Sequence, residues 1–366
     1  MKANLAIIAA AGSGKTQDII DRALVDRSRR VLITTYTTDN LDQIRRRLAV
    51  AAGGVVPSNI TTMSWFSFLL NHGARPYQRA VLDDVPNVVK SLNFRATHSR
   101  FTRRADSYRY FLDSRGDMYS EGLAHFVCEA ERLTGGRVSA RLAQVYDDVF
   151  VDEVQDLVGW DLEVLDMLLD ARLTTTIVGD PRQHTYSTNR SSKNKKYRGA
   201  GLVDWFEERV DRCDLEERNY SSRCNQAICD LADGLFPELP ATISTNSKVT
   251  GHDGIFEISR SEVAEYVARY GPVILRNNRT VDTLGYPAVN FGAAKGATYD
   301  RVLIFPTKPI LKYLKSRLPD DAGSKDRLYV AITRARFSVA FVVGLATAHP
   351  SRPLHALTDD YRSRSC

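Results

Sequence analysis

Short apolar runs alternate with amphipathic segments along most of the chain. The runs are rich in valine, isoleucine and threonine, as at 31–35 and 149–152, and such runs predict buried strands. Alternation of strands with helical patterns is typical of α/β domains built on parallel sheets. The pattern predicts two groups of strands, the first at 5–10, 31–35, 149–152 and 175–179, and the second at 255–259, 272–275, 301–305 and 338–343.

A polar, basic stretch at 189–201 separates the two groups of strands. We therefore expect two domains, residues 1–212 and 213–366, with a boundary near Cys213. Within the first domain, residues from about 71 to 137 lack the alternation and carry many arginines and aromatic residues. This region predicts a helical insertion in the first domain.

The composition and the apolar runs indicate which compartment the protein occupies and whether it binds a membrane. No run approaches the roughly 18 apolar residues of a membrane span, so no membrane partner is expected. The opening MKANLAIIAAAG imitates a short signal peptide, but it leads directly into GSGKT, and a buried strand explains it better. The five cysteines form no CxxC pair, which favours reduced thiols and a cytoplasmic protein. A zinc site at Cys224 and Cys229 stays open as an alternative.

The first chemical motif follows the first predicted strand. Residues 9–16 read AAAGSGKT and would open a helix, which is the context of a phosphate-binding P-loop. Glycines let backbone amides approach phosphate oxygens, and a helix N-terminus adds positive potential. We expect Lys15 to contact the β- and γ-phosphates of ATP and Thr16 to coordinate Mg²⁺. The expected nucleotide-binding residues are Ala11, Gly12, Ser13, Gly14, Lys15 and Thr16.

Two acids end the apolar run at 149–152. Asp152 would hold Mg²⁺, and Glu153 would orient and deprotonate the water that attacks the γ-phosphate. A solvated turn would also place acids after a strand. The P-loop upstream favours the catalytic interpretation.

With Gln155 and Asp156, the acids form the sequence DEVQD, which resembles the DExQD box of the UvrD/Rep/PcrA group of superfamily 1 DNA helicases. Further segments resemble other boxes of that group in the same order. They are 35–38 (TYTT), 62–66 (TMSWF), 179–183 (GDPRQ), 219–223 (NYSSR), 295–300 (KGATYD) and 328–336 (LYVAITRAR). The resemblance implies two RecA-like lobes in a compact form that lacks the large accessory domain of the second lobe.

The resemblance also assigns roles to individual residues. It implies that Gln183 senses the γ-phosphate and that Arg223 and Arg334 act as arginine fingers, because a guanidinium grips phosphate oxygens bidentately. For the aromatic residues of these boxes, core packing stays open as the alternative. The implied nucleic-acid contacts are Tyr36, Thr37, Trp65, Tyr186 and Lys295.

Several positions depart from the pattern of that group. Thr188 and Asn189 stand where the group has a base-stacking aromatic residue followed by arginine. Two basic stretches, 94–104 and 190–198, carry aromatic residues among their cations and could contact a phosphate backbone. A solvated charged face is the alternative for both stretches. The net charge of +6 fits a polyanionic partner.

The function implied is that of an ATP-dependent DNA helicase or translocase. It would act on single-stranded DNA, or on duplex with a single-stranded tail, with 3′-to-5′ polarity. A second hypothesis is a DNA-stimulated ATPase switch that licenses a partner, such as a nuclease or another repair or defence protein, without unwinding. A third is a degenerate ATP-binding protein, which the intact ATPase residues argue against.

Overall fold

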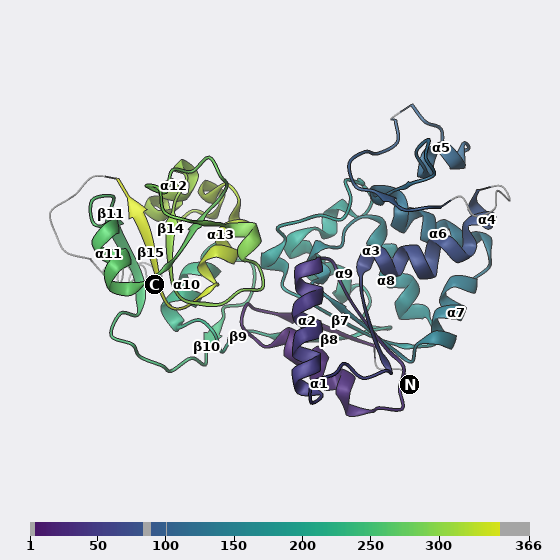
Figure 1. Cartoon of the computed structure of the whole chain (residues 1–366), viewed down its shortest axis with the longest axis horizontal. Coiled ribbons are helices and arrows are strands. Elements are labelled where there is room, and N and C mark those ends of the chain that lie inside the picture. The colour runs from purple at the N-terminus through teal and green to yellow at the C-terminus, as the bar shows by residue number, and fades with distance from the viewer. Residues whose placement is uncertain (1–3, 83–88, 100, 345–366) are drawn as a thin grey trace, which may run out of the picture. The chain divides into compact units, whose positions relative to one another are not determined.

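The computed structural model describes residues 4–82, 89–99 and 101–344 of the chain (Figure 1). Internal contacts divide the chain into two compact units. The first unit contains the residues up to Ile8 and Lys15–Glu217. The second contains Ala9–Gly14 and the residues from Arg218 onward, so the short segment between the first strand and the first helix groups with the second unit.

The first unit is built on a six-stranded sheet with the order β3-β2-β6-β7-β1-β8. β2 pairs in parallel with β3 and β6, and β7 pairs in parallel with β6 and β1. The central strands are buried on both faces, as expected for a parallel sheet covered by helices. The strands are β1 (Leu5–Ala9), β2 (Val31–Thr35), β3 (Ile60–Ser64), β6 (Asp148–Asp152), β7 (Thr174–Gly179) and β8 (Asp214–Arg218).

Four helices follow strands of this sheet along the chain. They are α1 (Lys15–Val25), α2 (Thr38–Ala51), α8 (Trp160–Asp170) and α9 (Leu202–Glu207). α2 begins at a side-chain cap, because the hydroxyl of Thr37 accepts a hydrogen bond from the backbone N–H of Asn40 at 3.2 Å. Thr37 thus has a structural role at the start of this helix.

The insertion lies between β3 and β6 and is mostly helical. Among its described residues, one short parallel pair joins β4 (Leu92–Asn93) to β5 (Met118–Tyr119). α6 contacts both the π-helical turn Leu69–Ala74 and α8, so the insertion shares the core of the first unit. The helices are α3 (Trp65–Phe68), α4 (Gln78–Val81), α5 (Ser107–Phe111), α6 (Leu123–Leu133) and α7 (Arg137–Val145).

The second unit has a five-stranded sheet with the order β11-β15-β14-β12-β13, and every pair in it is parallel. The strands are β11 (Gly254–Ser259), β12 (Val273–Arg276), β13 (Val289–Asn290), β14 (Tyr299–Phe305) and β15 (Ala335–Val343). A separate parallel pair joins β9 (Tyr220–Ser221) to β10 (Ile243–Ser244).

Alternate residues of β14 enter two different cores, as the two-residue period of a strand requires. Val302 and Ile304 join the core that includes α10 (Gln226–Asp233), α12 (Lys308–Ser316) and α13 (Lys325–Ile332). Leu303 and Phe305 join the core that includes α11 (Val263–Tyr270). Helices therefore cover both faces of this sheet.

These two sheets confirm the α/β class with parallel sheets. No helix in the described part of the chain is long and apolar enough to cross a membrane. Cys224 and Cys229 are both buried free thiols, and the described residues contain no group of three histidine, cysteine or acidic side chains arranged for a metal ion. The zinc alternative therefore gains no support from residues 4–82, 89–99 and 101–344.

His125 joins the insertion to α8. Its ring stacks on Trp160, with ring centroids 3.9 Å apart and an interplanar angle of 10°. The side chain is buried, and Nε2 has no hydrogen-bond partner among the residues that the structure describes. Burial lowers the pKa of His125 to about 4, because a protonated ring would lose its hydration.

Acidification should therefore destabilise this contact. Between the folded pKa of about 4 and an unfolded value near 6.5, the unfolded chain binds more protons, so stability falls as pH falls through this window. From pH 7 to pH 5 the expected loss is about 1–2 kcal/mol. Urea unfolding of wild type and His125→Phe at both pH values measures it. An equal pH dependence in the two proteins would rule out His125 as the source.

Candidate functional site

The segment between β1 and α1 has the backbone of a phosphate-binding loop. Gly12 and Gly14 have φ values of 84° and 86°, a region that favours glycine. A Cβ placed on Gly14 would meet no atom within 4 Å, so this side of the loop is open. Ser13 is buried, and its hydroxyl has no hydrogen-bond partner among the described residues. An unsatisfied hydroxyl at a helix N-terminus fits a phosphate ligand.

Thr16 and Asp152 are hydrogen-bonded to each other within the first unit. The Thr16 hydroxyl donates to Asp152 Oδ2 at 3.1 Å. Asp152 is buried at the end of β6, and burial together with the neighbouring Glu153 raises its pKa to about 7. Lys15 opposes this shift through its positive charge. Two crowded acids and a hydroxyl are oxygen donors of the kind that Mg²⁺ prefers, so these residues fit a divalent cation.

Glu153 has an unusual backbone conformation. Its φ is 59°, in the left-handed region that few non-glycine residues adopt, and such conformations cluster at functional sites. The amide of Gln155 donates to the Glu153 carboxylate. The same amide accepts, through Oε1, from the backbone N–H of Asp180 at 3.0 Å. Gln155 thus orients the predicted catalytic base, a role that the sequence interpretation did not assign to it.

The box after β7 continues this network. Gln183 donates from Nε2 to Asp180 Oδ2 at 2.8 Å, and Asp180 is fully buried. Arg182 is also buried, with Nη1 3.6 Å from Asp180 Oδ1. Hydrogen bonds therefore connect Glu153 to Gln183 through Gln155 and Asp180. The signal for Gln155 was present in the DEVQD box, since glutamine offers a donor and an acceptor at once.

The two arginines that were predicted to act as arginine fingers lie around one turn of the second unit, where α13 ends. Arg223 donates from Nη1 to the carbonyl of Thr333 at 3.1 Å. Arg334 is buried and donates from Nε to the carbonyl of Val330 at 3.1 Å. The structure therefore brings Arg223 and Arg334 to the same place within their own unit. Lys295 also belongs to this unit and is largely buried.

Tyr36 and Tyr186 lie next to each other on the first unit. Their ring centroids are 6.3 Å apart, and Tyr36 also contacts Phe66 at 5.8 Å. Tyr186 is 40% exposed, whereas Tyr36 and Phe66 are half-buried. These two tyrosines come from separate boxes and meet in space, as an aromatic surface for bases requires.

Trp65 does not belong to this surface, which corrects the expectation that it contacts nucleic acid. Its side chain is fully buried, and its indole Nε1 donates to Asp161 Oδ1 at 2.6 Å. Asp161 also accepts from the hydroxyl of Thr188 and, at 3.0 Å, from the amide of Asn189. The alternative of core packing therefore describes Trp65, because a buried carboxylate satisfies its indole N–H.

The same contacts explain why Thr188 and Asn189 depart from the helicase pattern. Both side chains are buried and serve Asp161 on α8. Two small polar residues can reach this carboxylate inside the unit, where a large aromatic residue would have to point outward. This position therefore contributes to the core of the first unit.

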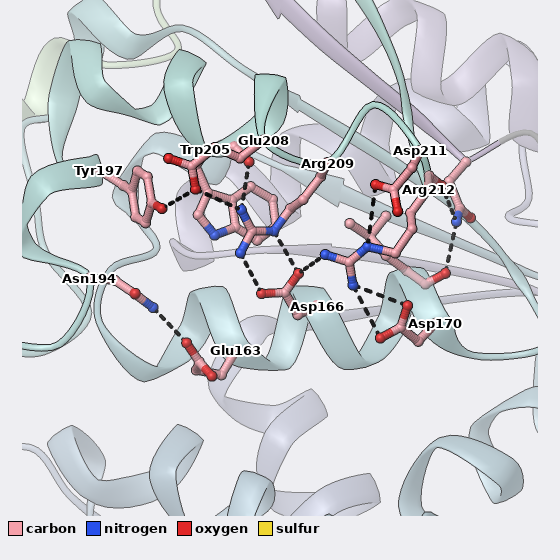
Figure 2. Close-up of polar contacts among 12 residues, drawn as sticks. Glu163, Asp166, Asp170, Asn194, Tyr197, Trp205, Glu208, Arg209, Asp211 and Arg212 are labelled. Atoms are coloured by element: carbon pink, nitrogen blue, oxygen red, sulfur yellow. Dashed lines mark hydrogen bonds and ion pairs between the residues drawn. The ribbon is translucent and has the colours of Figure 1, made fainter.

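The basic stretch 190–198 faces acids of its own unit. Lys193 lies 3.3 Å from Glu163, and Lys196 lies 3.0 Å from Glu208. Figure 2 shows two further contacts of these acids, from Asn194 to Glu163 and from Tyr197 to Glu208. Figure 2 also shows the α8 carboxylates Asp166 and Asp170 meeting Arg209 and Arg212. Much of the positive charge here is therefore compensated locally, which favours the solvated-face alternative for Lys193 and Lys196.

Comparison with protein-family models identifies a helicase core. The family model of the viral superfamily 1 RNA helicase core domain matches residues 117–343, more than half of the chain. No curated protein matches the chain.

Two solved structures of arterivirus nonstructural protein 10, a helicase, are similar to it. One matches with 16% identity and a TM-score of 0.46, covering 93% of this chain and 59% of the other. Its complex with DNA matches with 15% identity and a TM-score of 0.46, covering 93% and 61%. The chain thus spans about three fifths of the length of these two solved structures.

The family match corrects one part of the sequence interpretation. It supports superfamily 1 but not the UvrD/Rep/PcrA group whose boxes the chain resembles. On the match over residues 117–343, the chain belongs to the viral superfamily 1 RNA helicase core domain family.

Proposed function

We propose that the chain is an ATP-dependent translocase and helicase that moves on single-stranded DNA, with 3′-to-5′ polarity. The observation that carries the proposal is the arrangement of Thr16, Asp152 and Glu153 in the first unit, with Thr16 two residues after the glycine loop. It combines a loop backbone with two glycines at positive φ, a hydroxyl bonded to a buried acid and a second acid held by Gln155. These are the parts that nucleotide hydrolysis needs.

In this proposal the residues divide the work of ATP hydrolysis. Lys15 and the loop amides bind the phosphates, and Thr16 and Asp152 hold Mg²⁺. The metal, when bound, supplies charge neutralisation at the phosphate oxygens. Glu153 orients the water and takes its proton. We further assign to Gln183 the role of γ-phosphate sensor and to Arg223 and Arg334 the role of arginine fingers. These assignments rest on the helicase-like sequence boxes that contain the three residues.

The hydrogen-bonded series from Glu153 to Gln183 supports coupling of hydrolysis to nucleic acid. A change in hydrogen bonding at Glu153 would act on Gln155, which also holds the backbone of Asp180. The segment that follows Gln183 ends at Tyr186, on the aromatic surface beside Tyr36. The nucleotide state can therefore bias how this surface holds a base.

DNA is proposed as the substrate because the DEVQD and LYVAITRAR segments resemble boxes of DNA helicases. The matching family is described as one of RNA helicases, so RNA is the essential comparison. The finer placement in the UvrD/Rep/PcrA group belongs to this proposal as well.

ATP turnover with and without nucleic acid tests the proposal. Single-stranded DNA should raise the ATPase rate several-fold, and strand separation of a forked duplex should require ATP. Greater stimulation by RNA than by DNA would reassign the substrate. A flat response to both polymers at all oligonucleotide lengths would contradict the proposal.

The switch hypothesis keeps one observation in its favour. Thr188 and Asn189 are committed to Asp161 inside the first unit, so the base-stacking aromatic residue and arginine of DNA helicases have no counterpart at these positions. DNA-stimulated hydrolysis without strand separation or movement would favour this hypothesis, in which the ATPase licenses a partner such as a nuclease.

A further inference from the structure

The aromatic surface of the first unit continues into the insertion. Phe66 contacts Tyr36 at 5.8 Å on one side and Phe94 at 5.1 Å on the other, measured between ring centroids. Tyr186 lies at the far end, 6.3 Å from Tyr36. Four rings from separate parts of the sequence therefore form one row, which we call the aromatic row: Tyr186, Tyr36, Phe66 and Phe94.

Phe94 is the most open ring of this row. Its side chain is 64% exposed, whereas most phenylalanines of the core are buried. The loop that carries it is held in place, because Asn93 Oδ1 accepts from the backbone N–H of Arg95 and of Ala96. Asn93 is in turn anchored through Nδ2 to Asp113 at 2.9 Å. The exposure of Phe94 is therefore set by a defined turn.

Positive charge accompanies Phe94 in the same basic stretch. Arg95 and Arg103 are exposed, and neither makes an ion pair with any residue that the structure describes. Arg104 pairs with Glu129 at 2.9 Å. Within the described part of this stretch, two arginines therefore keep a positive charge that no acid compensates, and one of them directly follows the exposed ring.

We infer that Phe94 is a stacking platform for a base of single-stranded nucleic acid, with Arg95, the next residue, and Arg103 of the same basic stretch supplying positive charge for the phosphates. The inference rests on the proposed function and extends its binding surface from the helicase-like boxes into the insertion. An exposed ring followed by an arginine that pairs with no described acid is complementary to a chain of flat bases and negative phosphates. The centroid distances of 5.1, 5.8 and 6.3 Å show that consecutive rings of the row are in contact.

Binding of a labelled oligodeoxythymidine of about 16 nucleotides tests this role, because that length is the upper end of the site sizes of single-strand-binding OB-folds and exceeds the four rings of the row. Phe94→Ala should weaken binding about tenfold, since one stacked base is lost. Phe94→Tyr should retain binding, because the ring is kept. The matched control is Leu133→Ala, which truncates another exposed apolar residue of the insertion and should change nothing.

A second readout separates stacking from a structural effect. A fluorescent adenine analogue at single positions of the oligonucleotide should be quenched on wild type at one position and regain its emission on Phe94→Ala. The ATPase rate without nucleic acid should be the same for both proteins. Equal affinity and equal quenching in wild type and Phe94→Ala would overturn the inference alone. If wild type binds neither DNA nor RNA, the proposed function fails together with it.

Discussion

Replacement of Lys15 by alanine is expected to reduce ATP turnover by a factor of roughly 10²–10³, the loss typical when one preorganised donor to a developing negative charge is removed. Lys15 follows the glycine loop and begins α1, next to Thr16, which is bonded to Asp152. Its ammonium would contact the β- and γ-phosphates, where charge develops during phosphoryl transfer. Phosphate release under saturating ATP, with and without single-stranded DNA, measures the loss.

The matched control for this substitution is Lys308→Ala, which removes an exposed lysine at the start of α12. Its turnover should equal that of wild type. Circular dichroism should show that both variants are folded. Undiminished hydrolysis by Lys15→Ala would mean that the glycine loop is not the site of nucleotide chemistry.

Glu153→Gln should bind ATP but lose turnover by roughly 10²–10⁴, the contribution typical of a general base. Glutamine has nearly the same shape, can adopt the same left-handed backbone about as well as glutamate, and can still accept a hydrogen bond from Gln155. It cannot take a proton from water. A fluorescent ATP analogue measures binding, and phosphate release measures turnover.

Glu207→Gln is the matched control, because Glu207 is an exposed glutamate at the end of α9. It should leave binding and turnover unchanged. Loss of nucleotide binding in Glu153→Gln, with turnover falling only in proportion, would assign Glu153 to metal or phosphate binding and remove it from the role of base.

The buried strands were predictable because residues of a parallel sheet covered on both faces are apolar without interruption. The run at 31–35 coincides with β2, and those at 149–152 and 175–179 fall one residue short of β6 and β7. In the first sheet, the strands missed were β3 and β8, which lie at its two edges. Both are only partly buried, and β8 has the charged sequence DLEER. Edge strands need less apolar surface, so hydrophobicity does not mark them.

The site was predictable where its geometry is local. The glycine loop and the acids after β6 take their positions from a strand end and a helix start, which short motifs encode. Trp65 was misplaced because its burial depends on Asp161, nearly a hundred residues away. Phe94 likewise joins the aromatic row through a contact with Phe66 that sequence spacing cannot express. Tertiary contacts of this kind decide whether an aromatic residue of a motif faces solvent or core.

Binding of a nucleic acid displaces cations condensed on the phosphates. The slope with which the binding constant falls as salt concentration rises therefore reports the number of protein charges that replace these cations. Lys193 and Lys196 already lie within ion-pair distance of Glu163 and Glu208. Each such lysine gives up an acid partner if it takes a phosphate, so it adds less to this count than an unpaired arginine. The affinity of the protein for the nucleic acid should consequently depend less steeply on ionic strength than the number of lysines and arginines in the protein suggests.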